Sequence, residues 1–133
     1  MVNIWEGDMD FKAIAQELVA GCREGRELEN LDKLYAADAV SVEAMTMPGA
    51  DSAETHGLDG IKGKHAWWSE NFEVIEGIVD GPYVHGEGSF AVIFDIKARN
   101  KATGDVDAMK EVAIYTVAGG RIVREEFYYA TAA

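Results

Sequence analysis

Basic residues are scarce in this chain of 133 residues, which has 12 Lys and Arg against 24 Asp and Glu and a formal net charge of −12. A surface with this charge repels phosphate backbones and anionic lipids, so neither a nucleic acid nor a membrane is expected as a partner. No uninterrupted apolar run approaches the length of a membrane span. The first residues also lack the basic start and apolar stretch of a secretory signal, so we expect a soluble cytoplasmic protein.

Cysteine occurs once, as Cys22, so the chain can form no internal disulfide and no cluster of thiolate metal ligands. The histidines, His56, His65 and His85, stand far apart and show no HxH or HExxH spacing. The sequence also lacks a GxGxxG, P-loop or GxSxG motif. We therefore expect neither a metal nor another cofactor.

The chain does contain enough apolar residues to fold as one domain spanning residues 1–133. Its hydrophobic content is 48% and includes three Trp, five Tyr and five Phe, which a disordered chain would lack. A chain of this length can form a core without disulfides. No repeat, low-complexity tract or linker divides it.

Three helices are predicted from apolar residues at helical spacing. Asp8 or Asp10 can cap the first, whose apolar face runs from Phe11 to Cys22 and which Gly25 can end. The second is shorter and has one apolar face, made of Leu28, Leu31, Leu34 and Tyr35. The third is predicted over residues 58–75, where one stripe contains Ile61, His65, Trp68 and Phe72.

Five strands are predicted around the third helix. The first, over residues 39–45, has Ser41 and Glu43 on one side and Val40 and Val42 on the other. Two more strands follow the helix over residues 78–85 and 89–99, and a loop covers 47–57. An order of helix, helix, strand, helix and four strands is typical of an α+β fold, in which helices close one face of a curved antiparallel or mixed sheet.

The stretch over residues 106–130 is predicted to form a β-hairpin. Residues alternate in period two on both sides of Ala118-Gly119-Gly120, where a glycine can adopt the positive φ of a three-residue turn. This turn would pair Tyr115 with Val123, Ala113 with Glu125, and Glu111 with Phe127. Two carboxylates, a phenol and an aromatic ring would then share one side of the sheet.

A shorter turn changes the residues on that side. A two-residue turn at Gly119-Gly120 moves the second strand by one residue and brings Glu126 and Tyr128 beside Glu111 and Tyr115. We favour the three-residue turn, which leaves the choice between Glu125 and Glu126 to the structure.

The order and spacing of these segments resemble the SnoaL-like group of nuclear-transport-factor-2-like domains, which have a cystatin-like α+β cone fold. The matching segments are the first helix ending at Gly25, LDKLYAADAVSVEA, GLDGIKGKHAWW and EVAIYTVAGGRIVREEF. The resemblance implies a cone with a pocket, closed by three N-terminal helices, and commonly a homodimer through the outer sheet face. The favoured turn places Val112, Ile114 and Ile122 on that face.

Ketosteroid isomerases, which share this fold, allow a comparison residue by residue. The resemblance places their catalytic aspartate on Glu43, which retains a carboxylate. It places their two oxyanion-hole donors on Leu18 and near Ala113, and neither side chain can donate a hydrogen bond. The resemblance therefore does not imply steroid isomerisation by that mechanism.

The candidates for acid/base chemistry are Glu111, Tyr115, Glu43 and Glu125. A carboxylate desolvated in an apolar cone beside another carboxylate can hold its proton near neutral pH and then donate it. We expect Glu111 as the general acid/base, Tyr115 as a hydrogen-bond donor and Glu43 or Glu125 as the second carboxylate. Isomerisation, cyclisation or dehydration without a cofactor would suit these groups. Alternatively, they pair with one another or with basic residues and only stabilise the sheet.

The candidates to line a pocket for a small, largely apolar molecule are Tyr35, His65, Trp68, Phe72, Phe90, Phe94 and Phe127. Core packing accounts for the same residues at the same spacing, since the upper core of a cone is also its pocket wall. A non-catalytic ligand-binding or dimerisation module is therefore the alternative function.

Overall fold

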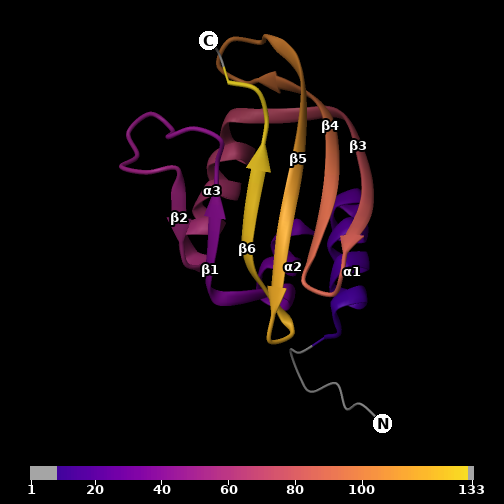
Figure 1. Cartoon of the computed structure of the whole chain (residues 1–133). Helices are drawn as coiled ribbons and strands as arrows, with labels where there is room; N and C mark the ends of the chain where they lie inside the picture. The colour runs from indigo at the N-terminus through magenta and orange to yellow at the C-terminus, as the bar shows by residue number, and fades with distance from the viewer. Residues whose placement is uncertain (1–8, 132–133) are drawn as a thin grey trace.

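The computed structural model describes residues 9–131 and consists of three helices and a six-stranded sheet (Figure 1). The helices are α1 (Phe11–Glu24), α2 (Glu27–Leu34) and α3 (Leu58–Asn71). The strands are β1 (Tyr35–Val42), β2 (Glu54–His56), β3 (Phe72–His85), β4 (Ser89–Asn100), β5 (Val106–Ala118) and β6 (Arg121–Tyr128). No helix within residues 9–131 is long and apolar enough to cross a membrane.

The strands follow the order β2-β1-β6-β5-β4-β3 across the sheet. Only β1 and β6 run parallel among these neighbours, and the other adjacent strands are antiparallel. Figure 1 shows the three helices together behind the sheet, while its other face is open toward the viewer. The expected α+β class, with helices against one face of a curved mixed sheet, is confirmed.

Helix α1 begins and ends where the sequence indicates. The side chain of Asp10 accepts a hydrogen bond from the backbone N of Ala13 at 2.8 Å, which makes Asp10 the N-cap. Gly25 ends the helix in the left-handed conformation with a φ of 73°. The other candidate cap, Asp8, lies outside the described residues.

Several predicted element limits were wrong, because strands begin at residues that helical spacing had assigned to the ends of helices. Tyr35 was expected on the second helix but opens β1. Phe72 was expected on the third helix but opens β3, where it pairs with Asn100. Leu28 was expected on the apolar face of α2 and is instead 60% exposed. The predicted loop contains the short strand β2, which pairs with β1.

The turn between β5 and β6 has two residues, so the predicted three-residue turn was wrong. Gly119 and Gly120 both have positive φ, 60° and 76°, as a type I′ turn requires. Ala118 therefore pairs with Arg121 across the turn.

A β-bulge in β6 shifts the strand back by one residue and so cancels the shift that the shorter turn causes. The pairing skips Val123, so that Thr116 pairs with Arg124 and Tyr115 with Glu125. The extra residue returns Glu125, rather than Glu126, to the side of the sheet that the helices cover. The pairings predicted for Tyr115, Ala113 and Glu111 were thus wrong in partner, while Glu125 and Phe127 do lie on their side.

The hydrophobic core lies between the helices and this side of the sheet. It joins α1 and α2 to β1, β4, β5 and β6 through residues such as Ile14, Leu34, Phe90, Ala113 and Ile122. Ile122 was expected on the outer sheet face but is 0% exposed, because it precedes the bulge and so points inward. Val112 and Ile114 do lie on the outer face, since they alternate with the buried Ala113 and Tyr115.

Candidate functional site

A buried carboxylate in β6 is the first component of a polar network on the helix side of the sheet. Glu125 is 3% exposed, and both of its oxygens accept hydrogen bonds. Tyr35, at the start of β1, donates to Oε1, and the Ser41 hydroxyl donates to Oε2 at 2.6 Å. Burial and the nearby Glu125 charge raise the pKa of Tyr35, so its hydroxyl stays protonated as the donor.

A lysine of α3 extends this network to a second carboxylate. Lys64 Nζ donates to Ser41 Oγ at 2.8 Å and forms an ion pair with Glu43, which directly follows β1. Tyr129, just after β6, donates to the other oxygen of Glu43 at 2.8 Å. The ammonium also lies 5.3 Å from the ring centroid of Phe127. Both carboxylates therefore have all of their oxygens bonded.

Glu111 of β5 is the third carboxylate on this side, and it differs from the other two. It pairs with Phe94 of β4 and is half-buried, yet no donor among residues 9–131 contacts its carboxyl group. Burial is the main cause that raises its pKa to about 7, and the nearby charges of Glu43 and Glu125 act in the same direction. Lys64 opposes them. Glu111 is thus present in both protonation states near neutral pH.

Tyr115 lies deeper along the same strand. It is 3% exposed and stacks on Phe90 with ring centroids 5.0 Å apart. Burial raises its pKa well above the usual value, so the phenol is neutral. Its hydroxyl makes no hydrogen bond with the described residues. Because it is four residues from Glu111, the two Cα atoms are about 13 Å apart, so one small group cannot contact both side chains.

An apolar surface remains open beyond Glu111. Phe94, Ile96 and Ala98 alternate along β4 and so share the helix-covered face, together with their partners Met109 and Val74. Met109 is 37% exposed and Val74 is 50% exposed, which shows that the helices do not cover this end completely.

Aromatic rings of α3 and β3 stand at the same open end of the sheet. Trp68 stacks on Phe72 with centroids 4.4 Å apart and an interplanar angle of 20°. Both side chains are half-buried, as is Phe127. These three predicted ligand-binding residues therefore remain partly accessible, and Phe127, which pairs with Ala113, lies nearer to Glu111 in the sheet than Phe72, which pairs with Asn100.

The other predicted ligand-binding residues have different surroundings. Phe90 and Phe94 belong to the packed core, and Tyr35 is bound to Glu125. His65 lines an open hollow of about 500 Å³ between α2 and α3, together with Leu28 and Lys62. A second hollow lies on the outer sheet face, and neither of these two is lined by Glu111 or Tyr115. A pocket at Glu111 therefore stays a prediction.

Three network residues, Ser41, Lys64 and Tyr129, were missed from the sequence. Lys64 follows Ile61 by three residues and precedes Trp68 by four, so it lies on the apolar stripe that had been assigned to His65. Helical spacing could have identified it. Tyr129 continues the alternation of Glu125 and Phe127 beyond the end of β6, so strand phase could have placed it on the same side.

Two further side chains bear on possible chemistry. Cys22 is half-buried against the core, and burial raises the pKa of its thiol to about 12, so it is a structural thiol. Within the part of the chain that the structure describes, no group of His, Cys, Asp or Glu side chains has the arrangement of a metal site.

Comparison with known proteins defines the family. The sequence profile of the SnoaL-like domain matches residues 9–129, so the chain belongs to the SnoaL-like family. A crystal structure from Mesorhizobium loti, provisionally named a SnoaL-like polyketide cyclase [carbohydrate phosphatase], is 40% identical in sequence. The match covers 91% of this chain and 100% of that one, with a TM-score of 0.83.

More distant structures share the fold. An NTF2-like protein from Burkholderia thailandensis is 14% identical, with a TM-score of 0.76 over 92% of each chain. A provisionally named isomerase from Bacillus subtilis is 16% identical, with a TM-score of 0.74 over 92% of this chain and 90% of that one. No protein of curated function matches the sequence.

Proposed function

We propose that this protein binds a small, largely apolar molecule at the open end of the helix-covered sheet face and that Glu111 exchanges a proton with it. The observation that carries the proposal is the state of Glu111. Both oxygens of Glu43 and of Glu125 accept hydrogen bonds. The carboxyl group of Glu111 is half-buried and accepts no hydrogen bond from residues 9–131.

The chemistry that suits this arrangement is acid/base catalysis without a cofactor. A group with a pKa of about 7 can take a proton from the substrate and return it at another atom. Glu43 acts as the second carboxylate, which favours the protonated form of Glu111 through its charge. In this proposal the neutral Tyr115 hydroxyl donates a hydrogen bond to a ligand that displaces part of the packing in the deeper part of the sheet face. Isomerisation, cyclisation and dehydration all need such a proton transfer.

The Mesorhizobium loti protein supports cyclisation among these reactions. Its provisional name is that of a polyketide cyclase, and it is 40% identical to this chain. Ring closure by aldol addition needs a base that removes a proton from carbon and an acid that protonates the new alkoxide. A single carboxyl group that titrates near neutral pH can perform both steps in turn.

The test begins with mass spectrometry of small molecules that co-purify with the native protein. For any compound that the wild type converts, we expect Glu111→Gln to reduce turnover by about 10²- to 10⁴-fold and to change its affinity little, because the amide has nearly the same volume. The matched control is Glu87→Gln, which changes an exposed carboxylate in the turn between β3 and β4. Unchanged turnover in Glu111→Gln would remove this residue from the mechanism.

The packing favours one alternative, a non-catalytic binding module. Phe90, Phe94 and Tyr115 fill the deeper part of the sheet face, and the two hollows described above lie elsewhere. In that case the wild type would bind a co-purified molecule without converting it. Glu111→Gln would then change the pH dependence of binding and no rate.

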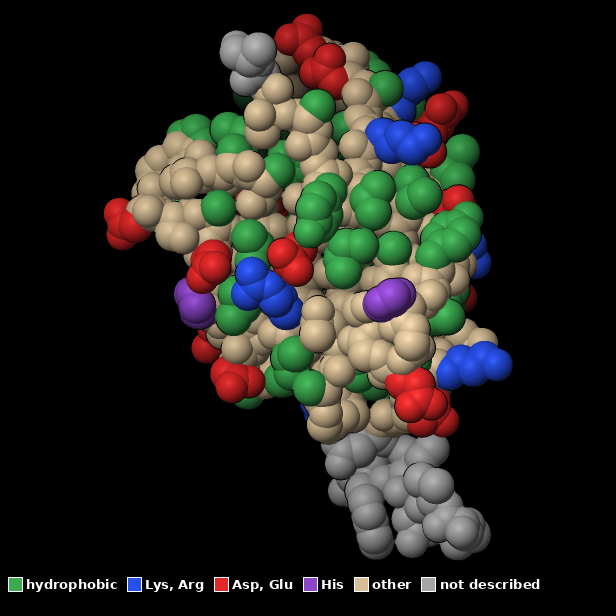
Figure 2. Space-filling model, viewed as in Figure 1, with side chains coloured by type: hydrophobic (Ala, Val, Ile, Leu, Met, Phe, Trp, Pro, Cys, Tyr) green, Lys and Arg blue, Asp and Glu red, His purple; other side chains and the backbone are tan. Residues whose placement is uncertain are grey.

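We also propose that two copies of the chain associate through the outer sheet face. Figure 2 shows hydrophobic side chains gathered on this face over β3, β4 and β5. Ile78, Tyr83 and Tyr128 are 65%, 52% and 55% exposed there, and Ile114 lies among them in the sheet. Apolar surface of this kind is typical of protein interfaces.

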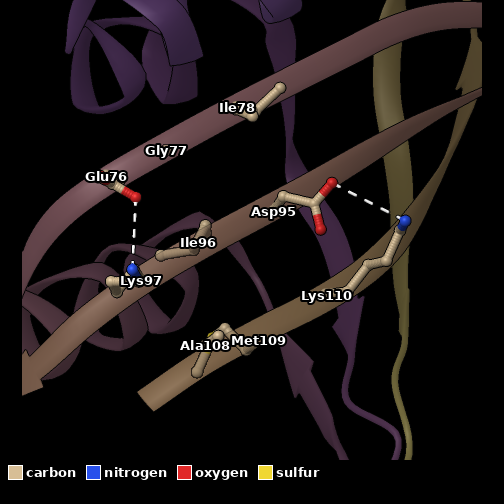
Figure 3. A pocket seen from close by; sticks show the side chains of 9 residues that line it. All are labelled: Glu76, Gly77, Ile78, Asp95, Ile96, Lys97, Ala108, Met109 and Lys110. Atoms are coloured by element: carbon tan, nitrogen blue, oxygen red, sulfur yellow. Dashed lines mark ion pairs between the residues drawn. The ribbon is translucent and has the colours of Figure 1, made fainter. Parts of the chain in front are cut away.

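Charged side chains border this surface in a pattern that suits a twofold contact. A hollow of about 510 Å³ lies between the ion pairs Glu76–Lys97 at 3.6 Å and Asp95–Lys110 at 3.8 Å (Figure 3). Each pair presents both signs of charge beside the exposed Ile78. A second copy, rotated by 180°, can therefore offer an opposite charge to each of them.

The dimer proposal predicts a mass near twice the 14.5 kDa of one chain in multi-angle light scattering. Ile114→Glu should weaken the association by about 100-fold, since it buries a carboxylate in an apolar contact. Leu28→Glu, an equally drastic change on the exposed side of α2, should leave the dimer intact. A wild type that is monomeric at every concentration would refute the proposal.

A further inference from the structure

Lys64 lies at the centre of the polar network, where three elements distant in sequence meet. It projects from α3 to Ser41 in β1 and to Glu43 just beyond β1, and it covers the ring of Phe127 in β6. Its side chain is 28% exposed, and that of Glu43 is 19% exposed. Its ammonium is the cation that pairs with Glu43 in this network.

The hydrogen bonds of Lys64 determine which carboxylates accept hydrogen bonds from the protein. Lys64 donates to one oxygen of Glu43, and Tyr129 donates to the other. Lys64 also donates to Ser41 Oγ, so the single proton of that hydroxyl is directed to Glu125. Both carboxylates are therefore fixed as acceptors through contacts that involve this lysine.

We propose that Lys64 is a positioning residue of the site, which fixes Glu43 and Glu125 as hydrogen-bond acceptors and leaves Glu111 as the one carboxyl of the three that exchanges a proton. The inference rests on the proposed role of Glu111. Lys64 acts on that role through its contacts with Glu43 and Ser41 and through its charge, since no hydrogen bond or ion pair joins it to Glu111 directly.

The charges around Glu111 have opposite effects on its pKa, and Lys64 supplies the positive one. The titratable groups that influence its pKa from neighbouring elements are Glu43 after β1, Lys64 of α3 and Glu125 of β6, while Tyr129 after β6 senses its charge in turn. Glu43 and Glu125 raise the pKa of Glu111, and Lys64 lowers it. Without the ammonium, Glu43 loses its counter-charge, so that its negative charge acts on Glu111 without opposition.

The experiment is a ¹³C NMR titration of the glutamate carboxyl groups in the full chain, with the Glu111 signal assigned from Glu111→Gln. In Lys64→Met we expect proton uptake by Glu111 to begin at a pH about one unit higher than in the wild type. Lys64→Arg retains the charge and should restore most of the wild-type titration. Lys62→Met is the matched control, because Lys62 lies on the same helix but pairs with the exposed Asp32 at 2.7 Å.

A double variant separates electrostatics from packing. Lys64→Met with Glu43→Gln removes one charge that lowers the Glu111 pKa and one that raises it, so the titration should return to within about half a unit of the wild type. A merely structural lysine predicts no such recovery. An unshifted Glu111 titration in folded Lys64→Met would overturn the proposal. If that variant does not fold, Lys64→Gln gives the same comparison while retaining a hydrogen-bond donor.

The outcome is distinguishable from failure of the proposed function. The titration reports on Glu111 in the free protein and needs no ligand or turnover. A wild type with Glu111 titrating near neutral pH and a shift in Lys64→Met would support the positioning role even if no substrate were converted. Absence of turnover would then count against the proposed function alone.

Discussion

At pH 8 we expect Glu111→Gln to be more stable than the wild type, with a free energy of unfolding about 3 kcal/mol higher. Burial first, and the charge of Glu43 second, raise the pKa of Glu111 from 4.5 to about 7 in the folded state. Between these two pH values the folded protein binds this proton more tightly than the unfolded chain does. The wild type therefore loses stability as the pH rises from 4.5 to 7, and glutamine, which cannot ionise, does not.

Urea unfolding at pH 4 and at pH 8 checks this prediction. At pH 4, Glu111 is mostly protonated in both the folded and the unfolded wild type. The free energies of unfolding of the two proteins should then differ by less than about 0.5 kcal/mol. Glu87→Gln, which changes an exposed carboxylate, should behave like the wild type at both pH values. Equal stabilities of Glu111→Gln and the wild type at pH 8 would show that Glu111 ionises as an ordinary surface residue.

The sign of this effect distinguishes the two interpretations of Glu111. A carboxylate that holds the sheet together lowers stability when it is replaced, as a lost ion pair or hydrogen bond does. A carboxylate retained for proton transfer is desolvated without compensation, so its replacement stabilises the fold while turnover is lost. An increase in stability together with a loss of function would therefore identify Glu111 as a functional residue.

Much of the fold was predictable because it depends on local patterns. Apolar residues at helical spacing, a cap at Asp10 and a glycine at Gly25 define α1 from adjacent residues alone. The alternation in β4 and β5 likewise indicates which residues face the core, and the buried Ala113 and Tyr115 agree with it. Local signals of this kind need no knowledge of the rest of the chain.

The β-bulge in β6 was not predictable from alternation. The sequence offered a three-residue turn, which points Glu125 inward, or a two-residue turn, which points Glu126 inward. The protein combines the two-residue turn at Gly119 and Gly120 with an extra residue at Val123, and Glu125 still points inward. The predicted side was therefore right for a reason that the pattern did not contain.

The candidate site was predictable only in part, because its hydrogen bonds join distant segments. Glu43, Glu111 and Glu125 could be placed on one side of the sheet from strand phase. The different environments of the three carboxylates could not be predicted, because they depend on Lys64 and Tyr129. These two side chains contact Glu43 from 21 and 86 residues away in the chain. Only the folded structure shows that Glu111 alone lacks a partner among the three.

Replacing Glu125, the buried carboxylate of β6, should destabilise the protein, whereas replacing Glu111 should stabilise it. Glu125→Ala should lower the free energy of unfolding by about 3 to 5 kcal/mol at pH 7, because the buried Tyr35 and Ser41 hydroxyls lose their acceptor and Lys64 loses a nearby negative charge. Urea unfolding at one protein concentration measures the difference. Glu126→Ala, the adjacent residue on the outer face, should change it by less than about 1 kcal/mol, since Glu126 forms only a partly exposed ion pair with Arg124 at 3.5 Å. Should the alanine at 126 cost more than the alanine at 125, the inward phase that the bulge imposes on β6 would be wrong, and with it the whole network around Lys64.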